Sequence, residues 1–165
     1  MKIEKAIKHD SNDLTELTIR SKSHWNYSKD QIEKWRDALT ISETYILEKE
    51  VYKLMNGNDL IGYYSYCEIN DRGVKLENLF IEPKFIGKGF GKMLMVDFLQ
   101  RIRKTKFEKI LLDADPNAEK FYEQFEFKTI GQLKTSIKNR FLPIMELKIK
   151  PANNKGEGAI NKNIK

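Results

Sequence analysis

The stretch VKLENLFIEPKFIGKGFG, residues 74–91, decides the fold of this chain. It begins as a β-strand, breaks at a proline and turns through a loop that contains Gly87, Gly89 and Gly91. An amphipathic helix is expected directly afterwards, over residues 89–104. Glycine lets the backbone approach an anion closely, and the free N–H groups and dipole at a helix start attract negative charge. The stretch therefore predicts a phosphate-binding turn between a strand and a helix.

The segments upstream of this stretch predict one strand, two helices and an antiparallel meander of three strands. In chain order these elements are expected over residues 2–8, 10–27, 28–39, and then 45–56, 59–70 and 74–82. Asp10 or Ser11 is the expected cap of the first helix, and Ser28 begins the second. Asn56-Gly57 between two β-type runs is typical of a hairpin turn.

The segments downstream predict a strand, a short helix and two closing strands, over residues 109–113, 118–125, 127–133 and 141–149. A strand, a helix and a second strand in this order favour a parallel crossover connection. We therefore expect an α/β (α+β) fold with a mixed, mostly antiparallel sheet of about seven strands flanked by helices. One domain is expected over residues 1–150, and a polar tail outside it over residues 151–165.

Composition narrows the class of protein. The chain has 165 residues, of which 40% are hydrophobic and 33% charged, and it contains no apolar run near the about 20 residues of a membrane span. The charged N-terminus lacks the apolar core of a signal peptide, so we expect a cytoplasmic protein without a membrane partner. Its single cysteine, Cys67, excludes an internal disulfide and a cysteine-rich zinc site. The net charge of +6 suits an anionic cofactor or a nucleic acid.

Two motifs together resemble those of the GNAT N-acyltransferase superfamily. Residues 74–94, VKLENLFIEPKFIGKGFGKML, resemble its motif A, in which Pro and then Arg or Gln precede G-x-G-x-G/A. Residues 113–127, DADPNAEKFYEQFEF, resemble its next motif, N-x-x-A-x-x-F-Y-x-x-x-G-F. The resemblance covers about residues 3–149 and implies the GNAT acyl-CoA fold, with acetyl-CoA as the usual co-substrate. It implies no metal.

The resemblance also implies a cofactor site. Backbone N–H groups of the glycine loop would bind the pyrophosphate, and the strand before the loop would pair with the pantetheine amides. An asparagine before the short helix would contact the cofactor as well. The implied cofactor residues are Leu79, Phe80, Ile81, Ile86, Gly87, Lys88, Gly89, Phe90, Gly91, Lys92 and Asn117.

Two residues are the catalytic candidates. The resemblance implies that an amine attacks the thioester directly while Tyr122 protonates the leaving thiolate. Glu77 is the candidate proton acceptor, although an exposed strand carboxylate is an equally good reading of it. This sequence departs from the family pattern at Ile86, where Arg or Gln is usual, and at Glu126, where Gly is usual. The first change weakens phosphate binding unless a nearby lysine compensates, and the second affects a turn.

The acceptor site is expected to draw on the early loop, the meander and the link before the last strand. Its candidate residues are His24, Trp25, Tyr27, Tyr64, Tyr66, Ser136 and Arg140. The alternative reading is that the aromatic residues belong to the core and that Arg140 is solvated. We expect a small-molecule or peptide amine as substrate, no nucleic acid, and a homodimer through the last strands. A non-catalytic acyl-CoA-binding module is the alternative function, and a nucleic-acid-binding protein is a weaker one.

Overall fold

The computed structural model describes residues 1–150, so the predicted tail over residues 151–165 lies outside the described residues. Seven strands form one sheet in the order β1-β2-β3-β4-β5-β7-β6. The strands are β1 (Lys2–Lys5), β2 (Glu50–Asn56), β3 (Asp59–Asn70), β4 (Gly73–Ile81), β5 (Lys109–Asp113), β6 (Lys128–Lys134) and β7 (Phe141–Lys148). The α-helices are α1 (Ser11–Ser23), α2 (Lys29–Lys34), α3 (Arg36–Leu39), α4 (Glu43–Glu48), α5 (Phe90–Arg103) and α6 (Glu119–Glu123). The predicted mixed sheet flanked by helices is confirmed.

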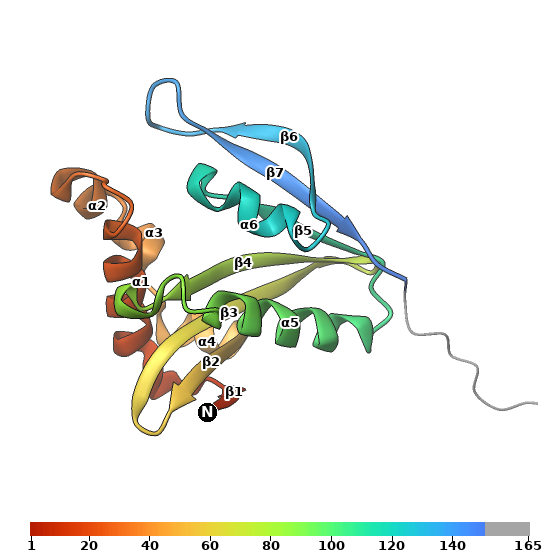
Figure 1. The fold of residues 1–165 in the computed structure, drawn as a ribbon, viewed down its shortest axis with the longest axis horizontal. Coiled ribbons are helices and arrows are strands. Elements are labelled where there is room, and N and C mark those ends of the chain that lie inside the picture. The colour runs from red at the N-terminus through yellow and green to blue at the C-terminus, as the bar shows by residue number, and fades with distance from the viewer. Residues whose placement is uncertain (151–165) are drawn as a thin grey trace, which may run out of the picture.

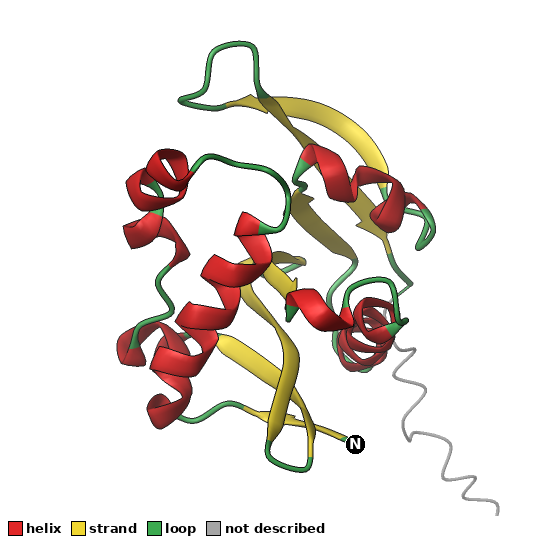
Figure 2. Ribbon diagram, turned by 60° about the vertical axis from the view of Figure 1, so that its left-hand side comes forward, coloured by secondary structure: helices red, strands yellow, loops and turns green. Residues whose placement is uncertain are grey.

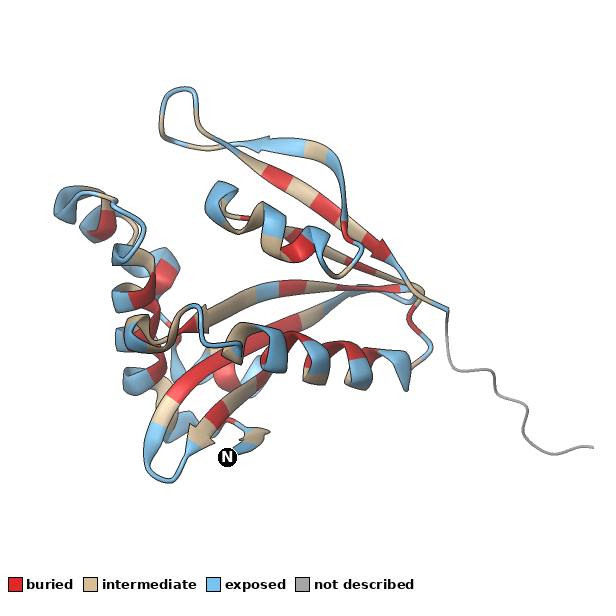
Figure 3. Cartoon of the chain, viewed as in Figure 1, coloured by how far each residue is buried: buried red, intermediate tan, exposed pale blue. Residues whose placement is uncertain are grey.

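Helices cover both faces of the sheet. Figure 2 shows α1 and its neighbours on one side of the strands and α5 on the other. Leu14 and Leu17 of α1 pack with Ile46 of α4 and Tyr63 of β3 in one cluster of buried residues. A second, larger cluster lies between the sheet and α5, whose buried face includes Phe98. Figure 3 shows buried residues along the central strands and on the side of α5 that faces them.

The two halves of the sheet are joined over a short distance. β4 and β5 are parallel and pair only through residues 73–75 and 109–111, whereas all other neighbouring strands are antiparallel. The remainder of β4, up to Ile81, continues to pair with β3. β4 and β5 therefore diverge beyond Lys75, and the sheet opens into a V in Figure 1. The predicted parallel connection between these strands is confirmed.

One predicted strand is wrong at its start. Residues 45–49 were expected to begin the strand over 45–56, but helix α4 occupies Glu43–Glu48 and β2 begins only at Glu50. The Ser42 side chain accepts a hydrogen bond from the Tyr45 N–H at 3.0 Å and so caps this helix. A short apolar run is compatible with either element, and burial of Ile46 against α1 decides for the helix.

Two predicted elements are shorter than expected. The strand over residues 2–8 ends at Lys5, and a 3₁₀ turn follows over Lys8–Asp10. Asp10 accepts a hydrogen bond from the Ile7 N–H at 2.8 Å, so its side chain closes this turn and does not cap α1. The helix over residues 28–39 is divided at Trp35 into α2 and α3. The predicted Ser28 cap is confirmed, because its hydroxyl accepts a hydrogen bond from the Gln31 N–H at 3.1 Å.

Within residues 1–150, no helix is long and apolar enough to cross a membrane.

Candidate active site at the split between β4 and β5

The glycine loop between β4 and α5 has the backbone that its sequence predicts. Gly87 and Gly89 have φ angles of 80° and 87°, which side chains other than glycine rarely adopt. A Cβ added at either residue would meet no atom within 4 Å, so open space lies above the loop. The first turn of α5 begins at Phe90, and N–H groups at that position have no acceptor inside a helix. The loop therefore fits an anion such as a phosphate.

Not every N–H group of the predicted phosphate site is free. The Ile86 and Lys88 N–H groups donate to carbonyls of the same loop, at 3.2 and 3.3 Å. No such backbone bond is found, among the described residues, for the N–H groups of Gly87, Gly89 and Phe90. These groups, followed by those of Gly91 and Lys92 in the first helical turn, are the donors that remain for a ligand.

Ile86, the departure from the family pattern, is half-buried and packs against the core beneath α5. Its side chain therefore cannot replace a polar group at a phosphate. The ammonium groups of Lys84 and Lys88 lie 4.9 and 5.5 Å from the centre of the Phe85 ring in the same loop. Two lysine side chains therefore lie in the loop, where the sequence analysis expected a lysine to compensate for the weaker phosphate binding caused by Ile86.

β4 carries a β-bulge close to the point where it leaves β5. Ser65 of β3 pairs with Asn78, but the next residue, Tyr66, pairs with Leu76, so Glu77 is the extra residue. Among the described strands, β4 has no partner on its β5 side beyond Lys75. The backbone of residues 79–81, predicted to bind cofactor, therefore pairs with β3 alone. Such an edge can pair with an extended ligand.

A hydrogen-bond network holds Glu77 and Asn78 on the side of the sheet that α4 covers. The Tyr45 hydroxyl contacts the Glu77 carboxylate at 2.6 Å, the Ser65 hydroxyl at 2.7 Å and the Asn78 side-chain amide at 2.9 Å. An ionised carboxylate only accepts hydrogen bonds, so Tyr45 must donate to Glu77. Burial, and next the bond to Glu77, raise the pKa of Tyr45, which keeps this donor protonated at neutral pH. Lys49 lies 3.7 Å from the other carboxylate oxygen.

Tyr122 of α6 is buried, and its ring packs edge-on against Phe121 and Phe127. None of the described side-chain contacts gives its hydroxyl a partner, and no fully buried polar side-chain atom lacks one, so this hydroxyl reaches accessible space. Burial raises the pKa of Tyr122, and the nearby charge of Asp115 raises it further. Tyr122 therefore remains a proton donor at neutral pH.

Asp115, at the start of the 3₁₀ turn over Pro116–Ala118, is the centre of a second network. It accepts hydrogen bonds from Lys22 at 2.5 Å, from the Tyr27 hydroxyl at 2.9 Å and from Arg140 at 3.2 Å. Arg140 also donates to the Tyr27 hydroxyl at 2.8 Å, and the Trp35 ring packs edge-on against the Tyr27 ring. We call Lys22, Tyr27, Trp35, Asp115 and Arg140 the Asp115 cluster.

Asn117, a predicted cofactor residue, is held beside this cluster. Its backbone N–H and side-chain amide both donate to Asp115, at 3.0 and 2.9 Å. Asp115 thereby caps the 3₁₀ turn that leads into α6. Burial alone would oppose ionisation of Asp115, but its bonds to Lys22 and Asn117 outweigh burial and lower its pKa.

The structure does not bring all predicted acceptor residues together. Tyr64 and Tyr66 lie on the α5 side of the sheet, where Tyr64 donates to Asp97 at 2.6 Å and Tyr66 packs against Phe98. They point to this side because side chains alternate along β3, and they belong to the core. His24 and Trp25 are exposed and pack against each other, and Ser136 is exposed between β6 and β7. Of the seven residues, Tyr27 and Arg140 are the two that meet at the open end of the split, where Arg140 donates a hydrogen bond to the Tyr27 hydroxyl.

Sequence reasoning did not identify Tyr45, Lys22 or Trp35 as site residues. Tyr45 was assigned to a strand, and only the helix that replaces that strand directs its hydroxyl to Glu77. Lys22 and Trp35 resemble an ordinary helix lysine and an apolar helix residue. The long sequence separation of their contacts, 93 residues between Lys22 and Asp115, leaves no local signal.

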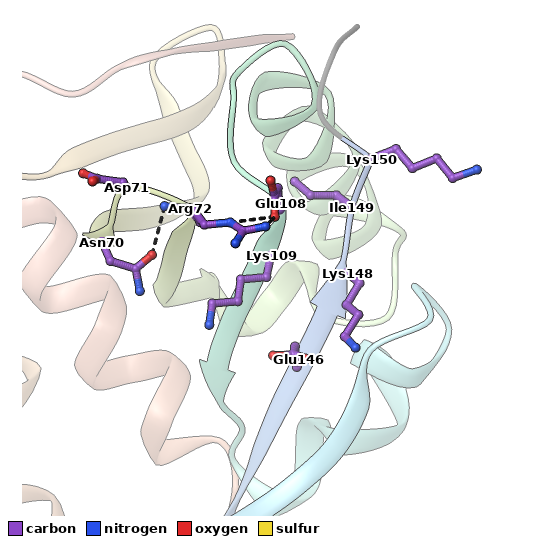
Figure 4. Close-up of a pocket in the computed structure, with 9 residues that line it drawn as sticks. All are labelled: Asn70, Asp71, Arg72, Glu108, Lys109, Glu146, Lys148, Ile149 and Lys150. Atoms are coloured by element: carbon purple, nitrogen blue, oxygen red, sulfur yellow. Dashed lines mark hydrogen bonds and ion pairs between the residues drawn. The ribbon is translucent and has the colours of Figure 1, made fainter.

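A separate open hollow lies at the paired end of β4 and β5, away from the glycine loop. Figure 4 shows the charged side chains around it, among them the ion pair between Arg72 and Glu108. The residues that line it are Asn70, Asp71, Arg72, Glu108, Lys109, Glu146, Lys148, Ile149 and Lys150. It contains none of the predicted site residues.

Comparisons with known proteins agree with this geometry. A family profile described as acetyltransferase (GNAT) domain matches residues 23–148. An uncharacterised N-acetyltransferase, ycf52, from Gracilaria tenuistipitata var. liui is 28% identical over 91 residues, which are 55% of this chain and 50% of that protein. Its counterpart from Pyropia yezoensis is 24% identical over 89 residues, 54% of this chain and 51% of that protein. The chain thus matches about half the length of these curated relatives.

Solved structures share the whole fold. The PaiA N-acetyltransferase from Thermoplasma acidophilum, in complex with coenzyme A, superposes with a TM-score of 0.75 at 21% identity. The alignment covers 90% of this chain and 98% of that one. YncA from Salmonella typhimurium, a putative acetyltransferase with its cofactor acetyl-CoA, gives a TM-score of 0.66 at 19% identity and covers 99% of both chains.

Proposed function

The chain belongs to the GNAT acetyltransferase family, and from this premise we propose that it transfers an acetyl group from acetyl-CoA to a primary amine of a small molecule or peptide. One observation carries the proposal. The glycine loop, with its free N–H groups, directly follows the stretch of β4 that has no partner on its β5 side. A phosphate site beside an unpaired strand edge suits a long ligand with a phosphate at one end and amides along its chain.

The proposed cofactor contacts follow from this arrangement. The N–H groups of Gly87, Gly89 and Phe90 hold the pyrophosphate, together with those of Gly91 and Lys92. Lys84 and Lys88 supply positive charge near the same loop. The backbone of residues 79–81 pairs with the pantetheine amides, and Asn117 lies at the opposite side of the split. Acetyl-CoA supplies the acetyl group as a thioester.

Two side chains move protons in the proposed reaction. Glu77 accepts the proton that the attacking amine loses as its nitrogen–carbon bond forms. Tyr122 donates a proton, or a hydrogen bond, to the sulfur as the carbon–sulfur bond breaks. The thiolate is a better leaving group when a donor neutralises its developing negative charge. Tyr45 supports Glu77 through the 2.6 Å hydrogen bond. An N–H group on the edge of β4 beyond Lys75, where β4 has no partner on its β5 side, stabilises the oxygen that gains negative charge.

The experiment combines binding and turnover. Acetyl-CoA is expected to raise the melting temperature, and an amine panel is expected to accelerate release of free CoA. Tyr122→Phe should lower kcat at least 10-fold, since one general acid contributes about 10²–10⁴-fold. Tyr66→Phe is the matched control, because it removes the same hydroxyl group from a tyrosine of β3 that lies in the core beneath α5.

Each other outcome has a definite meaning. Absence of acetyl-CoA binding at millimolar concentration contradicts the proposal. Binding of acetyl-CoA without turnover of any amine, with an unchanged Tyr122→Phe variant, favours a non-catalytic acyl-CoA-binding module. Salt-sensitive binding to nucleic acid would instead revive a nucleic-acid-binding function for this basic chain.

Because Cys67 is a free thiol, we propose a reducing compartment such as the cytoplasm.

A further inference from the structure

We propose that the amine acceptor carries an anionic group, a carboxylate or a phosphate, and that Lys22 and Arg140 of the Asp115 cluster bind it. The inference rests on the proposed function, since it concerns the acceptor of that reaction. It names a substrate class and assigns Lys22, Tyr27, Trp35 and Arg140 to its recognition.

The charges of the cluster are not balanced. Lys22 and Arg140 share one carboxylate, that of Asp115, at 2.5 and 3.2 Å. Within residues 1–150, neither cation forms an ion pair with a second acidic residue. The two cationic side chains are only 15% exposed, so water compensates little of the excess positive charge. A bound anion would balance this charge in surroundings that strengthen electrostatic attraction.

Both cations also retain hydrogen-bond donors. An ammonium group has three N–H donors, and the described contacts give Lys22 one acceptor, Asp115. A guanidinium group has five, and Arg140 uses one terminal nitrogen for both the Tyr27 hydroxyl and Asp115. The other terminal nitrogen and Nε of Arg140 have no acceptor among the described residues. These two groups lie on different edges of the guanidinium plane, and each can donate a charge-assisted hydrogen bond to an oxygen of a carboxylate or a phosphate.

Aromatic rings hold both cations in position. Lys22 lies 5.0 Å from the centre of the Tyr27 ring and 5.3 Å from that of the Trp35 ring. The Arg140 guanidinium lies 5.2 and 5.3 Å from the same two rings. These cation–π contacts limit the movement of the charged ends.

The cluster lies beside the proposed reaction centre. Asp115 lies two residues after the end of β5 and begins the segment that leads to Tyr122, and its charge is close enough to raise the pKa of Tyr122. Lys22 and Tyr27 come from the end of α1 and the connection to α2, which approach the β6–β7 connection at the open end of the V in Figure 1. An acceptor bound by its anionic end here can direct its amine toward Tyr122.

The same contacts have a purely structural alternative. They join the α1–α2 connection to the segment after β5 and to Arg140 before β7, so they could serve only to connect the two halves of the sheet. A connecting role predicts loss of stability when Arg140 is replaced, without any effect on discrimination between ligands. An anion-binding role predicts loss of discrimination.

The experiment measures this discrimination by fluorescence. The chain has two tryptophans, so Trp25→Phe leaves Trp35 as the only one. This protein, saturated with CoA, is titrated with glycine, 3-aminopropanoate, 4-aminobutanoate, 6-aminohexanoate and 2-aminoethyl phosphate. Each carboxylate is compared with its primary amide, and the phosphate with 2-aminoethanol. The same pairs are assayed for CoA release with acetyl-CoA.

At least one anionic probe is expected to bind 10-fold or more tightly than its neutral partner. Arg140→Met should reduce this ratio to below 3 and should raise KM more than it lowers kcat. Arg140→Lys should restore part of the ratio, since it keeps the positive charge but has fewer N–H donors than a guanidinium. Lys34→Met is the matched control, because Lys34 is an exposed residue of α2, and it should keep the wild-type ratio.

Equal affinity for every anionic and neutral pair overturns the inference, as does an Arg140→Met protein with the wild-type ratio. If Arg140→Met unfolds, the affinity ratio of the Arg140→Lys protein is used in its place. A ratio below the wild-type ratio supports the inference, and the wild-type ratio overturns it. Acetyl-CoA binding is measured separately by thermal shift. Its absence would contradict the proposed function whatever the tryptophan titration shows, so the two failures are distinguishable.

Discussion

The Tyr45 hydroxyl of α4 donates a hydrogen bond of 2.6 Å to the Glu77 carboxylate at the β4 bulge. Tyr45→Phe removes this donor and leaves the ring in place. We expect kcat to fall about 10-fold, because a charge-assisted hydrogen bond of about 1.5–3 kcal/mol positions the proposed base. The KM for acetyl-CoA should stay within twofold. Steady-state kinetics test this, and an equal loss in kcat for Tyr45→Phe in a Glu77→Gln background would show that the two residues act independently.

The positive φ angles of the glycine loop allow a matched test of the cofactor site. Gly87→Ala introduces a methyl group at a residue with φ of 80°, where it extends into the space proposed for phosphate. We expect acetyl-CoA affinity, measured by isothermal titration calorimetry, to fall at least 10-fold. Gly57→Ala is the control, because Gly57 has φ of 59° and equal free space but lies in the β2–β3 hairpin. Equal affinity losses in both variants would contradict the cofactor assignment.

Glu126 occupies a backbone conformation that suits glycine. Its φ angle is 68°, in the left-handed region, at the position where the GNAT motif that this segment resembles has glycine. Glu126→Gly should raise the free energy of unfolding by about 1 kcal/mol, since left-handed backbone costs other residues about 1–2 kcal/mol and glycine loses more entropy on folding. Urea denaturation measures the change. Glu123→Gly, at the last residue of α6, should instead lower stability, by up to about 1 kcal/mol.

Buried tyrosines make stability depend on alkaline pH. Burial raises the pKa of Tyr66 to about 12, and burial also raises the pKa of Tyr122. An unfolded tyrosine titrates near pH 10. Between that value and the folded pKa, only the unfolded chain loses its protons, so stability present below about pH 10 decreases as the pH rises. We expect the melting temperature to fall from pH 10 to pH 11.5, and to fall less steeply in Tyr66→Phe. Equal slopes would contradict the assigned burial effect.

We propose that the free edge of β6 pairs with a second copy of the chain. Within residues 1–150, β6 is the last strand of the sheet, and Ile130, Leu133 and the neighbouring Phe141 of β7 are 58%, 44% and 43% exposed. Apolar side chains on a free strand edge favour association. Sedimentation velocity at micromolar concentration should give a dimer that Leu133→Lys dissociates. A monomer in the unsubstituted chain would exclude this interface.

The elements that sequence analysis predicted correctly have strong local signals. The glycine loop requires positive φ at Gly87 and Gly89, and the Ser28 cap of α2 depends on residues three positions apart. The parallel crossover follows from the order of the elements. Local signals fail where tertiary packing chooses between conformations. Residues 45–49 suit a strand or a helix equally, and burial of Ile46 against α1 makes them helical.

The site was less predictable than the fold. Side chains along a strand alternate between the two faces of the sheet, and a β-bulge shifts this alternation by one residue. Whether Tyr64 faces α1 or α5 therefore depends on bulges in β3 and its neighbours, which the sequence does not reveal. The Asp115 cluster joins Lys22, Asp115 and Arg140, which lie far apart in the chain, so no spacing pattern identifies it. Positions with a backbone role were therefore predictable, whereas side chains that meet only after folding were not.

The parallel ladder between β4 and β5 contains three residue pairs, and this shortness has a mechanical consequence. A small change of angle at these pairs changes the width of the far end of the V while all three pairs remain intact. At the open end, where the proposed ligand binds, side-chain contacts such as those of the Asp115 cluster join the two halves, and β4 and β5 do not pair. An extended chain that bonds to the edge of β4 and contacts the opposite half would act as an additional strand, so the co-substrate would be a temporary part of the protein's own architecture.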